Sequence, residues 1–432
     1  MSLQPGHLGR AEVVFPLRGT GAGQLWTIDL PSSKQPLREA NLMTAPDVLA
    51  PAKLGPVTLR NRIIKSATFE GKTPDALVTD ELIEFHRRPA AGGVGMSTVA
   101  YCAVAPEGRT EYGQLWMRPD ALPGLRRLTD AIHSEGAAAS AQLGHAGPVA
   151  NQKSTGLPAL APSSSFNPLS MRMIRTATTA DITRIAAAHG SAAQLAVEAG
   201  FDAVEIHFGH NYFASSFLSP KLNRRKDSYG GSLENRARVV LETARSVRDA
   251  VGDKIAILAK LNMDDGVPGG FWVDEAIQVA QWLEASGSVD ALELTMGSSL
   301  LNPMYLFKGD APIREFAAAM PQPVRLGVHL VGKSMLHAYP YKPLFMLEEA
   351  RQIRAAVKLP LVLLGGVTDK AGMDTAMAEG FEFVAMARAL LREPDLINRI
   401  AAESDTQSLC IHCNKCMPTI FSGARCVLVE RV

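Results

Sequence analysis

Eight short apolar runs alternate with amphipathic stretches between Asn61 and Ile400, and this alternation limits the possible folds more than any other feature of the chain. Short apolar runs are typical of buried parallel strands, and the stretches between them are typical of helices that cover the sheet. The pattern predicts an α/β fold, a (β/α)8 TIM barrel, rather than a doubly wound open sheet, since no G-x-G-x-x-G motif follows the first run. The predicted strands cover residues 62–66, 93–99, 138–143, 203–207, 255–261, 291–295, 359–365 and 383–387.

Two of the stretches between the strands show a helical repeat. Four apolar residues from Val240 to Val251 recur at steps of four, three and four, and the glycine that follows them is typical of a helix end. A second helix is predicted from about residue 181 to residue 199. The stretch 300–341 is long and rich in Pro, Gly and Met, so it predicts a loop over the carboxyl ends of the strands, where TIM barrels carry their active sites.

The composition narrows the class of partner. A hydrophobic fraction of 47% and a charged fraction of 20% are typical of a folded globular protein and exclude disorder for most of the chain. The net charge of +1 leaves no electrostatic excess for general binding to nucleic acid or acidic lipid, which favours a small-molecule substrate. The chain has neither an apolar run long enough to span a membrane nor a secretory signal, so the predicted location is the cytoplasm.

Four of the five cysteines are crowded near the end of the sequence, and they divide the chain into three predicted parts. Residues 1–47 form an N-terminal extension without clean periodicity, residues 48–405 form the barrel, and residues 406–432 form a cysteine-containing tail. Such clustering is unlike a secreted disulfide framework and indicates metal, cluster or redox chemistry. On spacing alone the four thiols can ligate a [4Fe–4S] cluster or a zinc ion, or can remain free. They are Cys410, Cys413, Cys416 and Cys426.

The segment that carries most chemistry follows the fourth predicted strand. Residues 205–212 read E-I-H-F-G-H-N-Y, residues 217–220 read F-L-S-P, and residues 229–236 read Y-G-G-S-L-E-N-R. This pattern resembles the signature of the old yellow enzymes and of the wider NADH:flavin oxidoreductase family. The resemblance covers about residues 48 to 400. It implies a barrel that binds FMN, uses NAD(P)H as its reductant and in many members forms a homo-oligomer.

Two histidines and a tyrosine are the predicted catalytic residues. His207 and His210 leave the end of one strand, so both imidazoles can donate to one oxygen that gains negative charge. Without the flanking motif, a structural histidine pair or a zinc site is the favoured interpretation. The resemblance implies that they hold the carbonyl or nitro oxygen of an activated alkene, and that Tyr212 gives a proton to the α-carbon as general acid.

The resemblance also assigns residues to the flavin. Gln142 corresponds to the glutamine on the pyrimidine edge, and Lys260 stands where many members carry arginine, as a fixed cation that favours the anionic reduced flavin. An ordinary salt-bridged lysine and turn-forming glycines are the alternative interpretations. The sequence departs from the family pattern at Phe69, where a threonine or cysteine is usual, and at Ala146, where an arginine is usual. The remaining predicted flavin contacts are Ser66, Ala67 and Thr68 beside the ring, and Gly365, Gly366, Ala387 and Arg388 at the phosphate.

The tail resembles the iron–sulfur segment of larger relatives such as 2,4-dienoyl-CoA reductase and trimethylamine dehydrogenase, with shorter gaps before its last two cysteines.

The whole pattern predicts ping-pong catalysis, in which NAD(P)H reduces FMN and the hydride then passes to the β-carbon of an activated alkene. A demethylase or dehydrogenase that oxidises an amine or alcohol is an alternative. A catalytically idle barrel used as a binding module is another, and the altered Phe69 and Lys260 positions keep it open.

Overall fold

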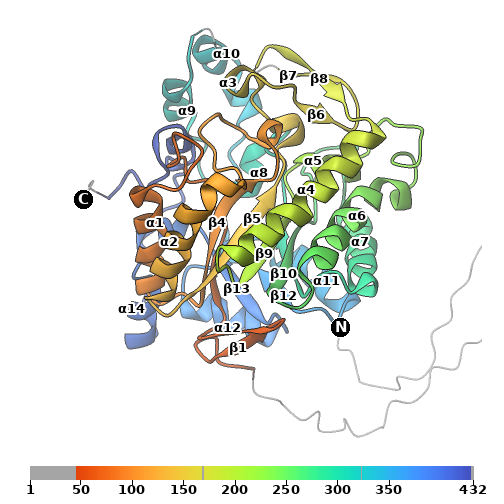
Figure 1. Cartoon of the computed structure of the whole chain (residues 1–432). Helices are drawn as coiled ribbons and strands as arrows, with labels where there is room; N and C mark the ends of the chain where they lie inside the picture. The colour runs from red at the N-terminus through yellow and green to blue at the C-terminus, as the bar shows by residue number, and fades with distance from the viewer. Residues whose placement is uncertain (1–44, 168–169, 323, 430–432) are drawn as a thin grey trace, which may run out of the picture. The chain divides into compact units, whose positions relative to one another are not determined.

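A closed barrel of eight parallel strands forms the centre of the protein (Figure 1), which confirms the predicted TIM barrel. The computed structural model describes residues 45–167, 170–322 and 324–429, and the predicted extension 1–47 falls almost entirely outside them. Each barrel strand overlaps one of the predicted runs, and the strands neighbour one another in sequence order. They are β3 (Ile63–Lys65), β4 (Met96–Ala103), β5 (Ala138–Gly144), β9 (Ala203–Phe208), β10 (Ala256–Asn262), β11 (Ala291–Thr295), β12 (Leu361–Leu363) and β13 (Phe383–Met386).

Alternate side chains of these strands fill the inside of the barrel. The amino-terminal end is an apolar layer that includes Ile64, Met96, Leu258 and Phe383, each almost completely buried. A short antiparallel hairpin of β1 (Ala52–Leu54) and β2 (Val57–Leu59) packs against this layer. Toward the carboxyl ends the inward side chains become polar, as expected where a TIM barrel carries its chemistry.

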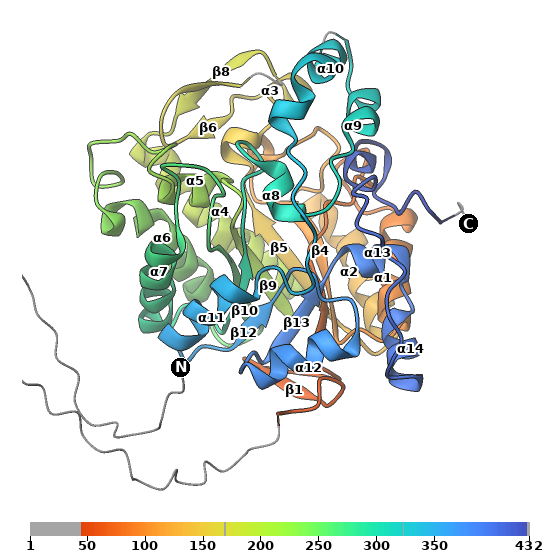
Figure 2. The same cartoon turned by 180° about the vertical axis from the view of Figure 1, so that it is seen from behind.

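Helices surround the barrel on all sides (Figures 1 and 2). The two helices predicted from their repeats are confirmed as α4 (Thr179–Glu198) and α6 (Leu233–Val251). Thr178 and Asp181 form a capping box that starts α4, and Gly252 ends α6 with φ of 56°. The other covering helices are α1 (Asp80–Ala91), α2 (Leu122–His133), α7 (Val273–Ser286), α11 (Leu347–Ala356), α12 (Lys370–Ala378) and α14 (Leu396–Ala402). Short helices follow four of the strands, namely α3 (Gln152–Thr155), α5 (Phe213–Leu218), α8 (Pro303–Phe307) and α13 (Arg388–Arg392).

Two long insertions lie above the carboxyl ends of the strands in both views. After β5 the chain forms a small sheet in the order β6 (Leu160–Ala161), β8 (Arg172–Thr176) and β7 (Ser165–Asn167). After β11 it forms α8, α9 (Ile313–Ala319) and α10 (Val324–Met335). The prediction of a loop over 300–341 was therefore wrong, because the stretch contains these three helices. It does lie over the carboxyl ends of the strands, as predicted.

Prolines explain why the helices in this insertion were missed. Pro303 opens α8 and Pro312 is the N-cap of α9, positions where a missing N–H breaks no helical hydrogen bond. A small apolar cluster of Ala317, Met320 and Val328 then packs α9 against α10. The prolines of this stretch thus mark helix starts rather than irregular chain.

The cysteine-containing segment packs on the barrel. The amide of Ser408 donates to the carbonyl of Thr368 at 3.0 Å, and the amide of Ala424 donates to the carbonyl of Glu70 at 2.7 Å. Between them residues Met417–Ser422 form a short 3-10 helix. The boundary after residue 405 stays a prediction. None of the described helices combines the length and the apolar composition that crossing a membrane requires.

Candidate active site

The three predicted catalytic side chains meet at the carboxyl end of β9. The rings of His207 and His210 lie with their centroids 5.0 Å apart, and the ring of Tyr212 packs edge-on against His207 at 4.5 Å. His207 is inside β9, and Tyr212 is the N-cap of α5. Between them Gly209 leaves room for the imidazole, because a Cβ there would lie 2.9 Å from Thr295 Cγ2 and 3.3 Å from His207 Cε1.

A buried carboxylate fixes the turn that brings these residues together. His210 and Asn211 both adopt left-handed backbone angles, with φ of 59° and 58°. Asp265 Oδ1 accepts from Asn211 Nδ2 at 3.0 Å and from Asn262 Nδ2 at 2.9 Å, while its other oxygen accepts from the amide of Phe271. Two non-glycine residues in this conformation are costly, and the Asp265 contacts offset part of that cost.

The two histidines differ in their surroundings. His210 Nε2 is 2.9 Å from Thr295 Oγ1, whereas His207 Nδ1 is buried and has no partner among the described residues. Burial lowers the pKa of His207 well below its ordinary value, and burial followed by the Lys260 charge lowers the pKa of His210 to about 3. Both imidazoles are therefore neutral at neutral pH, and each has one N–H to donate.

The tyrosine is held in an apolar wall. Burial raises the pKa of Tyr212 to about 12, so the phenol keeps its proton at neutral pH. Its ring packs edge-on against Tyr101 at 5.3 Å, and the hydroxyl of Tyr101 donates to the carbonyl of Gly108. Ala67 and Phe69 pack on the same wall, which explains how phenylalanine is accommodated where the family usually has a smaller polar residue.

A charged cluster lies inside the barrel below the histidines. Lys260 Nζ is 3.0 Å from Glu205 Oε1 and 2.9 Å from Glu293 Oε1. Ser66 Oγ donates to Glu293 at 2.7 Å, and Gln142 Nε2 donates to Glu205 at 2.6 Å. The predicted flavin contacts Ser66, Gln142 and Lys260 thus come together, and Lys260 is salt-bridged, as the alternative interpretation has it.

Burial and mutual charge determine how this cluster titrates. Burial raises the pKa of Glu205, and the neighbouring Glu293 carboxylate adds to the shift. Burial acts the same way on Glu293, but the Lys260 charge together with hydrogen bonds to the neighbouring side chains outweighs it and lowers that pKa. Burial opposes the charge on Lys260, but the two carboxylates raise its pKa above the ordinary value, so this lysine stays charged.

Sequence reasoning did not assign several residues of this site. The motif contains Glu205 without assigning it a role, and it does not include Glu293, Thr295 or Asp265. Glu293 is the sole charge in the apolar strand β11, and a lone charge inside a buried parallel strand is a usable signal because it must find a partner. Thr295 lies two residues further on, so the strand repeat places it on the same inward face.

The other predicted flavin residues are more dispersed. Thr68 Oγ1 donates to the carbonyl of Ser66 at 3.2 Å. Gly365 and Gly366, after β12, have φ of 98° and 81°, and the Gly366 carbonyl accepts from the hydroxyl of Tyr341 at 3.3 Å. Ala387 is the N-cap of α13 after β13.

Arg388 contacts the cysteine-containing segment. Its guanidinium donates to the carbonyl of Lys308 and to the side chain of Asn414, and it lines a cavity shared with the cysteines. The structure therefore places Arg388 between the barrel and the cysteine-containing segment. Its role at a flavin phosphate stays a prediction.

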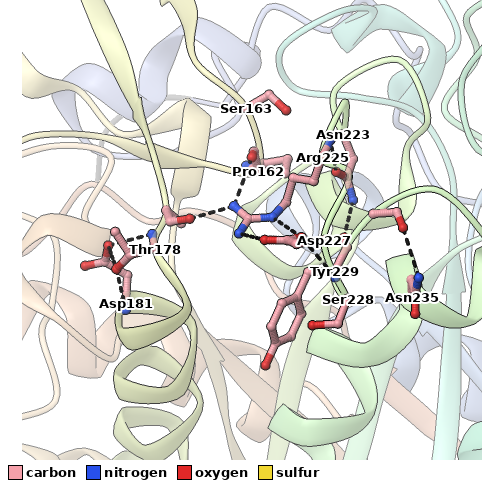
Figure 3. A network of polar contacts seen from close by, with 12 residues as sticks. Pro162, Ser163, Thr178, Asp181, Asn223, Arg225, Asp227, Ser228, Tyr229 and Asn235 are labelled. Carbon is pink, nitrogen blue, oxygen red and sulfur yellow. Dashed lines mark hydrogen bonds and ion pairs between the residues drawn. The ribbon is translucent and has the colours of Figure 1, made fainter.

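The second half of the sequence motif is a scaffold (Figure 3). The guanidinium of Arg225 pairs with Asp227 and donates to the carbonyls of Pro162 and Ala177, which ties the β9–α6 connection to the small sheet above the barrel. Asn223 Nδ2 donates to the carbonyls of Phe217 and Tyr229 at 2.8 and 2.7 Å. These contacts hold the β9–α6 connection, which contains the turn at His210 and Asn211.

The four clustered cysteines surround one small cavity of about 20 Å³. All are free thiols; burial raises the pKa of Cys416 to about 11 and also raises that of Cys410. Within the described ranges no group of three or more His, Cys, Asp or Glu side chains is arranged to hold a metal ion. His412, between the first two cysteines, stacks on Tyr341 with ring centroids 3.4 Å apart. The four thiols are thus neighbours, but they do not form a closed metal site by themselves.

Comparison with known proteins agrees with these features. Residues 47–297 match the NADH:flavin oxidoreductase / NADH oxidase family. A 4,4'-dithiodibutanoate disulfide reductase of Rhodococcus erythropolis is 53% identical over 383 residues, which is 89% of this chain and 95% of that protein.

Solved structures share the architecture. A 2-naphthoyl-CoA reductase in complex with 2-naphthoyl-CoA superposes with a TM-score of 0.73 at 26% identity, covering 87% of this chain and 55% of that one. This chain therefore spans about half of that reductase. The old yellow enzyme homologue of Zymomonas mobilis has the same fold, with a TM-score of 0.68, 22% identity, and 85% of this chain and 96% of that one covered. The family match and the 53% identical relative together show that the chain belongs to the NADH:flavin oxidoreductase / NADH oxidase family, as its motifs predicted.

Proposed function

We propose that the protein is an FMN-dependent reductase that takes hydride from NAD(P)H and passes it to a small organic acceptor. The observation that carries this proposal is the meeting of His207, His210 and Tyr212 at one end of the barrel. FMN, when bound, supplies the carrier that accepts and donates hydride. The side chains supply orientation, charge stabilisation and a proton.

The residues present fit a flavin. Glu205 Oε2 and Glu293 Oε2 are buried and have no hydrogen-bond partner among the described residues. Buried polar atoms of this kind normally find a partner, so a polar ligand or water at this level of the barrel is expected. Gln142 and Lys260 are the side chains proposed for the pyrimidine edge, with residues 66–68 beside the ring. The proposed phosphate contacts are Gly365, Gly366, Ala387 and Arg388.

An activated alkene suits the catalytic geometry best. Two neutral imidazoles can donate to one carbonyl or nitro oxygen, which gains negative charge as hydride reaches the β-carbon. Tyr212 then gives its proton to the α-carbon, and the C=C bond becomes a C–C bond carrying one hydride and one proton. The phenol regains a proton from solvent.

A small organic disulfide is a second candidate, favoured by the disulfide reductase that is 53% identical. In that reaction one hydride and one proton break the S–S bond and give two thiols. Tyr212 can protonate the leaving thiolate, while the histidines orient a polar group of the acceptor. The alkene and disulfide proposals share the same reductive half and differ only in the acceptor.

The cysteine-containing segment is proposed to hold a [4Fe–4S] cluster. Support comes from the four thiols that line one cavity, since four cysteines are the usual ligand set. Zinc or free thiols are the competing outcomes. A cytoplasmic location and a homo-oligomeric state belong to the proposal as well.

The test is an absorbance spectrum of the purified full chain, repeated without oxygen after adding NADH or NADPH. Flavin bands that bleach with nicotinamide and return with an enone support the alkene reductase, and return only with a disulfide supports the second candidate. Bleaching by an amine or alcohol instead of NAD(P)H would support the demethylase or dehydrogenase. A colourless protein that does not bind added FMN would support the alternative of a catalytically idle barrel used as a binding module. Iron and zinc analysis of the same sample identifies what the cysteines hold.

A further inference from the structure

The barrel strands contain few titratable side chains, and three of them touch one another. All eight strands are described, and the set consists of Lys65, Tyr101, Cys102, Glu205, His207, Lys260 and Glu293. Lys65 points outward, with Nζ 3.2 Å from the Thr98 carbonyl and over the Phe85 ring. Glu205, Lys260 and Glu293 lie on neighbouring strands with both carboxylates within 3.0 Å of one ammonium. We refer to these three residues as the triad.

The charges of the triad do not cancel when all three groups are ionised. Lys260, Glu205 and Glu293 are 2%, 1% and 0% exposed, so one negative charge would remain inside the barrel. An uncompensated charge at such a site is costly, and binding one proton removes it. Each carboxylate has one oxygen, Oε2, without a partner among the described residues, so each has an atom on which the proton can reside.

We propose that Glu205 and Glu293 hold one exchangeable proton beside Lys260, and that the triad takes up this proton when a bound flavin gains negative charge. The inference rests on the proposed function, in which a hydride from NAD(P)H brings two electrons and one proton to the cofactor. That transfer adds one negative charge near Lys260. A second proton, taken from solvent by a carboxylate, returns the net charge of the site to its value before reduction, and it is released when the hydride leaves.

The groups around the triad are not expected to take up this proton themselves. His207, on β9, and His210, after it, are neutral at neutral pH because burial and then nearby positive charge lower their pKa values. Gln142 and Ser66, the other direct partners, do not titrate in this range. Burial lowers the pKa of Lys65 to about 8; this side chain interacts most strongly with Glu70, outside the barrel wall, and only through longer-range charge with the triad. Because the pKa of Glu205 is raised, the triad should gain and lose its proton at a higher pH than an ordinary glutamate does.

The experiment is a redox titration of the FMN-loaded full chain from about pH 6 to about pH 10, which spans this exchange. For a two-electron couple, each proton taken up changes the midpoint potential by about 30 mV per pH unit. We expect about 30 mV per pH unit on the acid side, where the triad already holds its proton, and about 60 mV per pH unit on the alkaline side. In Glu205→Gln and in Glu293→Gln the slope should stay near 30 mV per pH unit throughout.

Glu70→Gln is the matched control, because Glu70 is also a buried carboxylate whose pKa burial raises to about 8, but it lies outside the barrel beside His86. This variant should keep the steepening of the wild-type protein. A wild-type slope near 30 mV per pH unit at every pH, or steepening that survives in both triad variants, would overturn the proposal. An infrared difference spectrum of the wild-type protein should also show a carboxylic acid signal that changes on reduction. Failure to bind FMN or to bleach with NAD(P)H would instead contradict the proposed function.

Discussion

The barrel site and the cysteine-containing segment gather functional side chains in opposite ways. In the barrel, Glu205, Lys260 and Glu293 come from three neighbouring strands, and the strand register brings their side chains together. In the cysteine-containing segment, four thiols surround a small cavity without bonding to one another. The barrel site is therefore formed by folding itself, whereas the proposed cluster at the cysteines would complete its site only on binding, as is usual for structural metal sites.

Exposure sharpens the contrast. The triad is almost completely buried, while the cysteine-containing segment leaves several large apolar side chains in contact with solvent. These are Leu409, Ile411, Phe421, Val427, Leu428 and Val429. Changes in the barrel should therefore affect the stability of the whole domain, and changes at the cysteines should act locally.

Removing the shared cation should have the largest effect. Lys260→Met leaves two buried carboxylates without a neighbouring cation, and we expect the free energy of unfolding to fall by about 3–5 kcal/mol. The loss should grow as pH rises. Without Lys260 both folded-state carboxyl pKa values lie above their unfolded values, so their stabilising contribution is lost as pH rises through the folded pKa. Urea unfolding at several pH values measures the change.

A double variant tests whether the cause is charge. Adding Glu205→Gln to Lys260→Met removes one of the two unpaired carboxylates, so the double variant should be more stable than the single one at alkaline pH. Equal stability of the two variants at every pH would mean that lost packing of the lysine stem, rather than charge, explains the effect.

The histidine pair should have the next largest effect, on the second half-reaction alone. His210→Ala removes one donor to the acceptor oxygen, and loss of such a donor lowers the rate by about 100- to 1000-fold. Anaerobic stopped-flow measurement of reoxidation by an enone follows this step. Bleaching by NAD(P)H in the same sample is the internal control and should change much less. A similar loss in both half-reactions would contradict the assigned role.

Thr295 should show a smaller effect through His210. Since Thr295 Oγ1 lies 2.9 Å from His210 Nε2, Thr295→Val removes the hydrogen bond that orients the ring. One such bond is worth about 0.5–1.5 kcal/mol, so reoxidation should slow by roughly two- to tenfold. Thr295→Ser keeps the hydroxyl and should restore the rate. If Ser behaves like Val, the methyl packing of Thr295 and not its hydroxyl matters.

The sequence predicted the barrel strands well, and it predicted that the three proposed catalytic residues lie close together, because both depend on local patterns. The eight apolar runs fix the strands, and His207, His210 and Tyr212 lie within one short segment. The partners of Lys260 were not foreseen, since Glu205 and Glu293 approach it only once the barrel closes. The direction of Arg388 was equally out of reach, because it depends on Asn414 from the distant cysteine-containing segment.

A cysteine variant should barely affect the barrel. Cys413→Ser should abolish iron binding if the proposed cluster forms, while the free energy of unfolding measured by flavin release should change by less than about 0.5 kcal/mol. Metal analysis and denaturant unfolding of one preparation give both numbers. Loss of bound FMN together with the iron would show that the two sites are coupled through Arg388, and the comparison between them would then fail.

The smallest expected effect is that of pH on binding of the acceptor. Because burial lowers the pKa of His210 to about 3 and that of His207 well below its ordinary value, both donors are neutral and do not titrate near neutrality. Tyr212, with its pKa raised to about 12, also keeps its proton. The affinity for an enone or a phenol, followed by the change in flavin absorbance, should therefore be flat from about pH 5.5 to about pH 8, the range in which an ordinary histidine titrates. An affinity that falls as pH rises through this range would mean that an imidazolium is the donor. In that case the histidine pair would carry a positive charge, and the carboxylates of Glu205 and Glu293 would have to compensate that charge as well as the charge of Lys260.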